Sequence, residues 1–131
     1  MIAIDSSAIV AILRLEPEAN LLLRALVRAE GRVMSALNVL ETSMVLAGPR
    51  GDASIWEPLD AFIAEAEIDI VPFDAGQAHF ARNAFVSFGK GRHPAALNFG
   101  DCAAYALAAS RRCPLLFKGE DFSKTDLIPA L

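Results

Sequence analysis

Four carboxylates in this 131-residue chain have types and positions that would let them act together chemically. Asp5 closes the apolar run IAID, and Asp121 follows the apolar run LLF in the turn KGED. Glu41 and Asp101 lie inside segments that are otherwise typical of helices. Clustered carboxylates need a compensating charge, and oxygen ligands of this kind suit Mg²⁺ or Mn²⁺ better than zinc. Such ions activate water and stabilise the charge that develops on a phosphate during in-line attack.

The two acids that follow predicted strands also have structural explanations. Asp5 can cap the helix that follows it, a role that contributes about 1 kcal/mol to stability. Asp121 belongs to an ordinary Gly-Glu-Asp turn, in which Glu120 and the later Asp126 are alternative candidates for the fourth acid. These structural roles stay open beside the metal-binding interpretation.

The two acids within predicted helices are harder to explain by structure alone. Their neighbours at helical spacing are mostly apolar: Leu37, Met44 and Val45 around Glu41, and Leu97, Ala104, Tyr105 and Ala108 around Asp101. A buried carboxylate must be paired, neutralised or bound to a cation, so a salt bridge between Glu41 and an arginine is the alternative there. If Asn98 caps its helix, Asp101 falls at the third helical position and can complete a capping box on the favourable end of the helix dipole.

The elements that must position these acids alternate along the chain. The predicted strands are residues 1–5, 32–36, 68–73 and 113–117, with a further short edge strand near Ile128 in a turn-rich tail. The predicted helices are residues 6–16, 17–31, 37–48, 51–67 and 74–89, followed by an Ala-rich helix capped by Asn98. This alternation predicts one α/β domain over residues 1–131, with a mostly parallel sheet and helices on both faces. Ligands of such folds bind at the carboxyl ends of the strands.

Composition limits the classes of protein to which the chain can belong. Hydrophobic residues make up 54% and charged residues 21%, which is enough for a core and argues against disorder. The net charge of −4 provides no global positive field, so nucleic acid would have to be held by local basic groups or bound cations. No apolar run approaches the roughly 20 residues of a membrane-spanning helix. Cys102 and Cys113 lack CxxC spacing, so we expect reduced thiols and a cytoplasmic setting.

Taken together, the motifs of this chain resemble those of the VapC-type PIN-domain ribonucleases, the toxins of bacterial toxin–antitoxin pairs. The resemblance is carried by the spacing of the four acids and by the segments IAIDSSAIVAIL, GKGRHPAALNFGDCAAYALA and LLFKGEDFSKTDL, so it covers the whole chain. It implies a three-layer α/β/α sandwich and Mg²⁺- or Mn²⁺-dependent endonucleolytic cleavage of RNA. It also implies a homodimer that is inhibited by a small VapB-like antitoxin whose tail enters the acidic groove.

The resemblance also assigns roles to individual residues. Asp5 and Asp101 correspond to the principal metal ligands, and Glu41 and Asp121 complete the acidic cluster directly or through water. Ser7 matches a hydroxyl often found beside the first aspartate, which is expected to contact phosphate or water. The chain departs from the family pattern at one position, because Asn38 stands where related sequences often carry a small hydroxyl residue.

Substrate binding is expected to involve the loop GKGRHP, which supplies Lys90 and Arg92 shortly before Asp101. These cations would hold the RNA backbone, although a solvated loop explains them equally well. Because metal-activated water is the expected nucleophile, the products would carry 5′-phosphate and 3′-hydroxyl ends. The alternatives are a catalytically silent binding module of the same fold and a DNA-directed nuclease of the same superfamily. A phosphorylated receiver domain is disfavoured, because only one acid follows the first strand.

Overall fold

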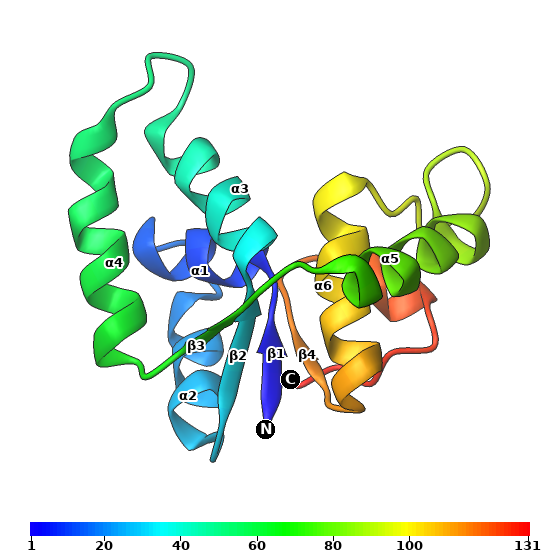
Figure 1. Cartoon of the computed structure of the whole chain (residues 1–131). Helices are drawn as coiled ribbons and strands as arrows, with labels where there is room; N and C mark the ends of the chain where they lie inside the picture. Colours follow the sequence, from blue (N-terminus) through cyan, green and yellow to red (C-terminus); the bar gives the residue numbers. More distant parts are fainter.

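The computed structural model describes all residues 1–131, and its elements alternate much as the sequence predicts (Figure 1). The strands are β1 (Ile2–Ile4), β2 (Arg32–Ser35), β3 (Asp69–Val71) and β4 (Leu115–Leu116). The helices are α1 (Ser6–Leu13), α2 (Ala19–Arg28), α3 (Ala36–Ala47), α4 (Trp56–Glu65), α5 (Ala75–Phe88) and α6 (Phe99–Arg111). Two short 3₁₀ helices, η1 (Ala53–Ile55) and η2 (Phe122–Lys124), complete the chain.

The four strands form one sheet in the order β3-β2-β1-β4, and every pairing is parallel. Ala3 of β1 stands opposite Val33 of β2 on one side and Leu115 of β4 on the other. From β1 the chain adds β2 and then β3 on one side of the sheet, and it later adds β4 on the other side, so the strand order reverses at β1. Such a point in an open parallel sheet is where ligands bind, beyond the carboxyl ends of the strands.

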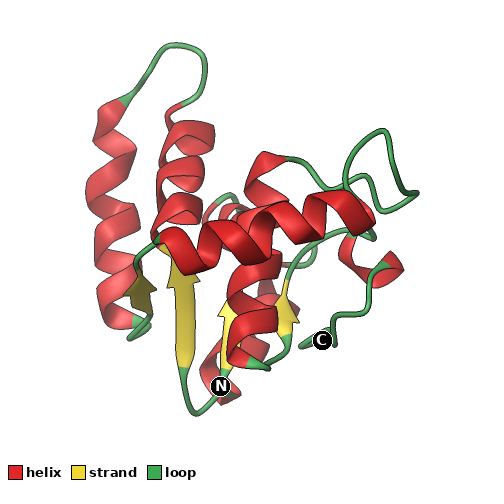
Figure 2. Ribbon diagram, turned by 45° about the vertical axis from the view of Figure 1, so that its right-hand side comes forward, coloured by secondary structure: helices red, strands yellow, loops and turns green.

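Helices cover both faces of the sheet, which confirms the predicted α/β/α sandwich (Figure 2). Side chains along a strand alternate between its faces, and β1 follows this rule. Ile2 and Ile4 pack with α1, α2 and α4 in one core cluster, whereas Ala3 packs with α5 and α6 in the other. The short side chains of α6, among them Ala103, Ala104 and Ala106, are fully or almost fully buried. An Ala-rich helix therefore lies close against the sheet.

Three predicted helices differ from the structure in their limits. The predicted helix 6–16 ends at Leu13. The predicted helix 51–67 is divided, since Asp52 caps the turn η1 by accepting a hydrogen bond from the Ser54 amide at 3.1 Å, and α4 begins only at Trp56. The predicted helix 17–31 is shorter and ends at Arg28. The predicted edge strand near Ile128 is reduced to a single bridge between Leu115 and Pro129.

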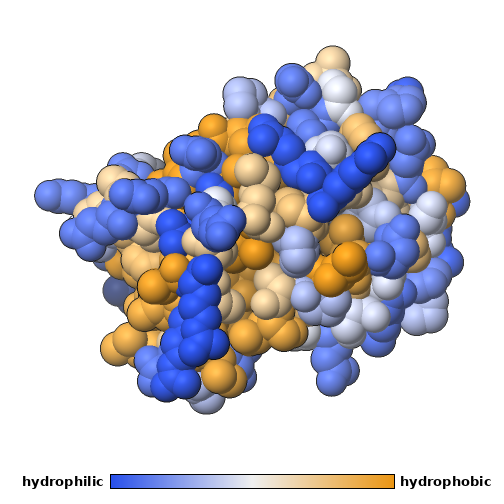
Figure 3. All heavy atoms as spheres, turned by 90° about the horizontal axis from the view of Figure 1, so that it is seen from below, coloured by the Kyte–Doolittle hydropathy of each residue, from blue (hydrophilic) through white to orange (hydrophobic).

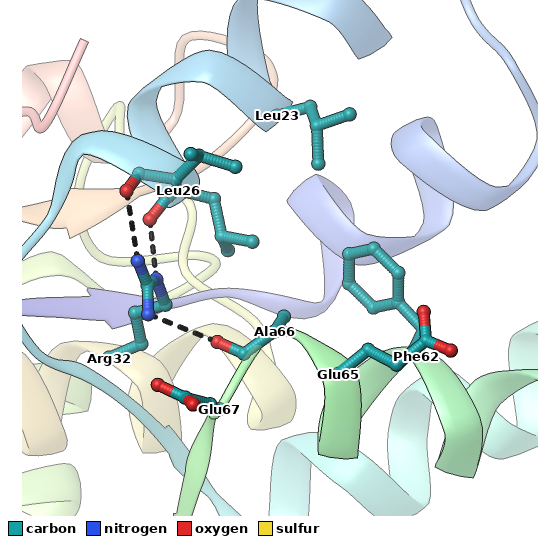
Figure 4. A pocket seen from close by; sticks show the side chains of 8 residues that line it. Leu23, Leu26, Arg32, Phe62, Glu65, Ala66 and Glu67 are labelled. Carbon is teal, nitrogen blue, oxygen red and sulfur yellow. Dashed lines mark hydrogen bonds between the residues drawn. The ribbon is translucent and has the colours of Figure 1, made fainter.

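One arginine fixes the end of α2 (Figure 4). The Arg32 guanidinium donates to the backbone carbonyls of Leu26, Val27 and Ala29 at 2.5, 2.9 and 2.9 Å, and to that of Ala66 at 3.2 Å. These carbonyls belong to the carboxyl-terminal ends of α2 and α4, which lack helical donors and carry the negative end of the helix dipole. Arg32 therefore joins two helices through their ends.

The face at the amino-terminal ends of the strands lies away from the expected site. Seen from below, it carries hydrophilic side chains beside apolar ones (Figure 3). A hollow in this part of the fold is formed by α2 together with the chain's last residues, and it is lined by Ile2, Leu21, Arg24, Ala25, Arg28, Ala29, Ala130 and Leu131. No helix is both long enough and apolar enough to cross a membrane.

Candidate active site

Three of the four predicted acids line one hollow of about 210 Å³ at the carboxyl end of β1. Asp5 follows β1 directly, Glu41 lies in the second turn of α3, and Asp101 lies in the first turn of α6. The hollow is lined by Asp5, Ser6, Ser7, Val10, Glu41, Val45 and Asp101. Residues that are almost one hundred positions apart in the sequence therefore meet at the place that the parallel sheet predicts.

Asp5 divides its two carboxylate oxygens between the fold and the hollow. Its backbone N–H donates to the Leu116 carbonyl at 2.9 Å, which anchors the residue to β4. The Oδ2 atom accepts a hydrogen bond from the Ser7 amide at 3.0 Å and so caps α1, as the structural alternative proposed. The Oδ1 atom is buried and has no hydrogen-bond partner. Capping therefore explains only one of the two oxygens.

Asp101 also has a structural role in addition to its place in the hollow. It forms the predicted capping box with Asn98: the Asp101 amide donates to Asn98 Oδ1 at 2.9 Å, and Asp101 Oδ2 accepts from the Asn98 amide at 3.0 Å. These reciprocal bonds fix the side chain at the start of α6. The cap holds Asp101 at the rim of the hollow.

Glu41 has hydroxyl and amide partners instead of the arginine that the alternative interpretation required. Its Oε1 lies 2.5 Å from Ser6 Oγ and 3.2 Å from Asn38 Nδ2, and the ion pairs of the structure involve only Lys118 with Glu16 and Glu18. The expectation of an apolar, buried surrounding was wrong on one side, because Met44 and Val45 are exposed. Glu41 therefore faces a groove that is open to solvent.

The fourth acid was ambiguous in the sequence, and the structure separates its three candidates. Asp121 does not line the hollow, but its charge is close enough to raise the pKa of Asp101. Asp126 Oδ1 instead accepts a hydrogen bond from the Tyr105 hydroxyl at 2.6 Å. Glu120 lines a different hollow, next to Phe117 and Leu131. Asp121 is thus the candidate whose charge acts on the site.

Of the three residues predicted to bind substrate, only Ser7 lines the hollow with the acids. Ser7 lines the hollow, and its Oγ accepts a hydrogen bond from the Lys118 amide at 2.9 Å, which ties the first turn of α1 to the end of β4. Neither Lys90 nor Arg92 lines the hollow. The Arg92 guanidinium lies over the Phe85 ring, 5.2 Å from its centroid. The structure therefore places Ser7 with the acids and the two loop cations outside the hollow.

Burial and like charges raise the pKa values of the two aspartates in the hollow. For Asp5 the main cause is burial, with further increases from the charges of Asp101 and Glu41, and its pKa rises from 3.8 to about 7 although hydrogen bonds from Ser7 oppose the change. Burial is also the main cause for Asp101, followed among the raising causes by the charges of Glu41 and Asp121. A site of this kind favours protonation or a bound cation.

The donor set fits a hard divalent cation. It consists of carboxylate and hydroxyl oxygens, with neither histidine nor cysteine among the residues that line the hollow. The unpartnered Oδ1 of Asp5 is the atom that such an ion would satisfy. As the side chains lie, no three His, Cys, Asp or Glu residues are close enough together to hold a metal ion. The carboxylates thus surround the hollow without converging on one point.

Three residues that complete the site were not identified from the sequence as functional. The sequence indicated no functional role for Ser6, and it marked Asn38 only as a departure from the family pattern; both contact Glu41. Gly100 lies against Glu41 so closely that a Cβ there would overlap the carboxylate. A glycine in the first turn of a helix was the available signal, since it weakens a helix unless close approach requires it.

Comparisons with known proteins agree with this geometry. The family model described as PIN domain matches residues 2–127. Ribonuclease VapC28 of Mycobacterium tuberculosis is 49% identical over 129 residues, which cover 98% of this chain and 96% of that protein. Ribonuclease VapC of Mycolicibacterium smegmatis is 48% identical over 124 residues, with 95% of each chain covered.

Solved structures show the same fold at much lower sequence identity. M. tuberculosis VapC20, a Sarcin-Ricin loop cleaving toxin, has a TM-score of 0.75 and 13% identity, with 98% of this chain and 97% of that chain covered. VapBC2 from Rickettsia felis, bound to a DNA fragment from its promoter, has a TM-score of 0.73 and 16% identity, with the same coverage. The chain belongs to the PIN-domain family, and within it to the VapC type.

Proposed function

We propose that this protein is a divalent-metal-dependent endoribonuclease that acts as the toxin of a type II toxin–antitoxin pair. The observation that carries the proposal is the meeting of Asp5, Glu41 and Asp101 around one hollow, in a chain whose relatives at 45–49% identity are named VapC ribonucleases. Residues 1–131 would act as one nuclease domain, because the four strands form a single sheet.

Within this proposal, each acid has a part in holding the ion or the water. Asp5 and Asp101 would be the principal ligands of Mg²⁺ or Mn²⁺, with the free Oδ1 of Asp5 as the first donor. The ion supplies an activated water and charge neutralisation at the phosphate. Glu41 and Asp121 would orient the attacking water or complete the acidic cluster. The products would then carry 5′-phosphate and 3′-hydroxyl ends.

Substrate binding would depend on local cations, since the net charge of the chain is −4. Lys90 and Arg92 form no ion pair and remain available to phosphates of the RNA backbone. Ser7 lines the hollow beside the acids, where its hydroxyl would contact a phosphate or a water. The RNA would therefore lie across the hollow with its backbone held from two directions.

The partners follow from the same family membership. We propose inhibition by a small VapB-like antitoxin whose tail enters the acidic groove, and assembly as a homodimer. An apolar hollow of about 300 Å³ beside α6, which includes the 80% exposed Phe99, supports the homodimer. Cys102 and Cys113 are both free, as expected of a cytoplasmic protein, and that location stays a prediction.

The test is cleavage of a mixed RNA pool and of duplex DNA by protein freed of any small co-purified partner. Each substrate is incubated with Mg²⁺, with Mn²⁺ and with EDTA, using the wild type and Asp101→Asn. We expect cleavage of RNA alone, only with metal, and a loss of at least about 100-fold in the variant, because one metal ligand loses its charge. End-labelling should detect 5′-phosphates.

Different failures have different meanings in this experiment. Cleavage of duplex DNA would identify a DNA-directed nuclease. Metal binding without cleavage of either substrate, detected as a rise in melting temperature, would mean that the substrate is wrong. Neither cleavage nor metal binding would support the silent binding module. Cleavage that persists in Asp101→Asn would remove Asp101 from the proposed site.

A further inference from the structure

Asn38 is a fully buried polar side chain at the point where three elements of the site meet. Its Nδ2 lies 3.2 Å from Glu41 Oε1 on the same helix and 3.0 Å from the Gly100 carbonyl of α6. Its backbone carbonyl accepts a hydrogen bond from Thr42 Oγ1 at 2.7 Å and lies 3.0 Å from Ser6 Oγ, whose single hydrogen it shares with Glu41 Oε1. From the helix that carries Glu41, one residue therefore contacts α1, which follows Asp5, and α6, which carries Asp101 in its first turn.

The orientation of the Asn38 amide follows from its neighbours. A carboxylate and a backbone carbonyl both accept hydrogen bonds, so only the NH₂ end of the amide can face them. Both of its hydrogens are then used, one for Glu41 and one for Gly100. The opposite end, Oδ1, is buried without a partner. Burying an oxygen without a hydrogen bond costs free energy, and the same orientation of the amide supplies two donors to the site.

The contacts of Glu41 leave one of its oxygens free. Both side-chain donors, Ser6 Oγ and Asn38 Nδ2, bind Oε1, and no hydrogen bond is made to Oε2. The carboxylate also lies in space that exists only because residue 100 is a glycine. Its position is therefore fixed by a donor on α1, a donor on α3 and a missing side chain on α6.

We propose that Asn38 is the positioning residue of this site: it holds the Glu41 carboxylate with one free oxygen and fixes the first turn of α6, which carries Asp101. The inference deepens the proposed function and rests on it. Residues that orient metal-site carboxylates through hydrogen bonds typically change metal affinity by about 10–100-fold when they are replaced. Asn38 would act in this way, although it touches neither the ion nor the RNA.

The experiment measures the affinity of the full chain for Mn²⁺ alone by calorimetry, together with melting in EDTA. Asn38→Leu keeps the volume of the side chain and removes both donors, whereas Gly100→Ala leaves Asn38 intact and displaces Glu41. We expect both variants to bind Mn²⁺ about 10–100-fold more weakly. Ser43→Ala is the matched control, because it removes a hydrogen bond of α3, from Ser43 Oγ to the Val39 carbonyl at 2.8 Å, that reaches neither Asn38 nor the acids, and its affinity should equal that of the wild type.

A double-mutant cycle separates positioning from a merely structural role. If Asn38 acts through Glu41, most of its effect on Mn²⁺ affinity should disappear in a Glu41→Gln background, since mutations of coupled residues are not additive. Equal losses in both backgrounds would overturn the inference, and so would wild-type affinity in a folded Asn38→Leu protein. If Asn38→Leu fails to fold, wild-type affinity in Gly100→Ala would overturn it. A wild type that binds no Mn²⁺ would overturn the proposed function together with the inference.

Discussion

At the scale of single residues, the same side chain serves folding and chemistry in two places. Asp5 caps α1 with one oxygen and leaves the other unpartnered in the hollow. Asp101 completes a capping box while it lines the same hollow. A cap fixes the carboxylate and lets it keep its charge near the positive end of a helix dipole. The structural and functional interpretations of these aspartates are therefore compatible.

The raised pKa of Asp5 predicts a stability that depends on pH when metal is absent. The pKa is about 7 in the folded protein and 3.8 for an unperturbed aspartate, which stands for the unfolded chain. Between pH 3.8 and pH 7, the folded state therefore keeps a proton that the unfolded state has lost. Stability from this group is therefore complete below about pH 4 and falls as the pH rises through 7.

Asp5→Asn should remove this dependence, because the amide keeps a cap oxygen and carries no charge. In EDTA at pH 8 the variant should melt at a higher temperature than the wild type. The difference is on the order of 4 kcal/mol at most, or roughly 10 °C, and should nearly vanish below about pH 4. Mn²⁺ should raise the melting temperature of the wild type but not of the variant.

Asp74→Asn supplies the control for this measurement, because Asp74 also caps a helix but is exposed. Its melting temperature should differ little from that of the wild type at pH 8. An Asp5→Asn protein that is less stable than the wild type at pH 8 in EDTA would mean that burial of this charge is not the dominant effect.

At the scale of elements, hydrophobic pattern and capping residues predicted most of the helices and all four strands. The pattern failed where long-range contacts decide the structure. The helix predicted over 17–31 ends at Arg28, where the Arg32 guanidinium binds carbonyls of its last turn and also reaches the Ala66 carbonyl at the end of α4, a contact that no local pattern predicts. The apolar stripe around Glu41 was predicted to be buried, but no layer of the fold covers Met44.

Arg32 gives the element-scale prediction. Arg32→Met should lower the free energy of unfolding by about 2–4 kcal/mol, because four carbonyls at two helix ends lose a charged donor. Denaturant unfolding measures the change, and the exposed Arg24→Met serves as control with an effect within about 0.5 kcal/mol. Equal stability of the two variants would show that the guanidinium contributes nothing beyond a surface arginine.

At the scale of the whole molecule, the acids of the site could be identified from the sequence, but the residues that hold the acids in position could not. Asp5, Glu41 and Asp101 stand out because charge is unexpected at their positions. Asn38 and Gly100 have ordinary residue types, and their roles depend on how α3 meets α6. Such contacts exist only after the chain has folded, so neither spacing nor composition predicts them.

Self-association gives the whole-molecule prediction. The apolar hollow beside α6 combines Leu37, Phe85 and Phe99, and we expect a second copy to cover it. Phe99→Ser should weaken the dimer at least about tenfold, since buried aromatic anchors dominate interface energies. Light scattering after gel filtration measures the mass. Leu15→Asn, at an 85% exposed position outside the hollow, should leave the mass unchanged. A dimer that only Leu15→Asn disrupts would place the interface elsewhere.

The pairing of the last residues with β4 has a practical consequence for handling the protein. The Leu115 amide donates to the Ile128 carbonyl at 3.0 Å, and the Ala130 amide donates to the Leu115 carbonyl at 2.9 Å. Without residues 128–131, these groups of Leu115 would be left as an open strand edge, which is a template for aggregation. Shortened versions of the chain should therefore keep this segment, and a purification tag is better placed away from it.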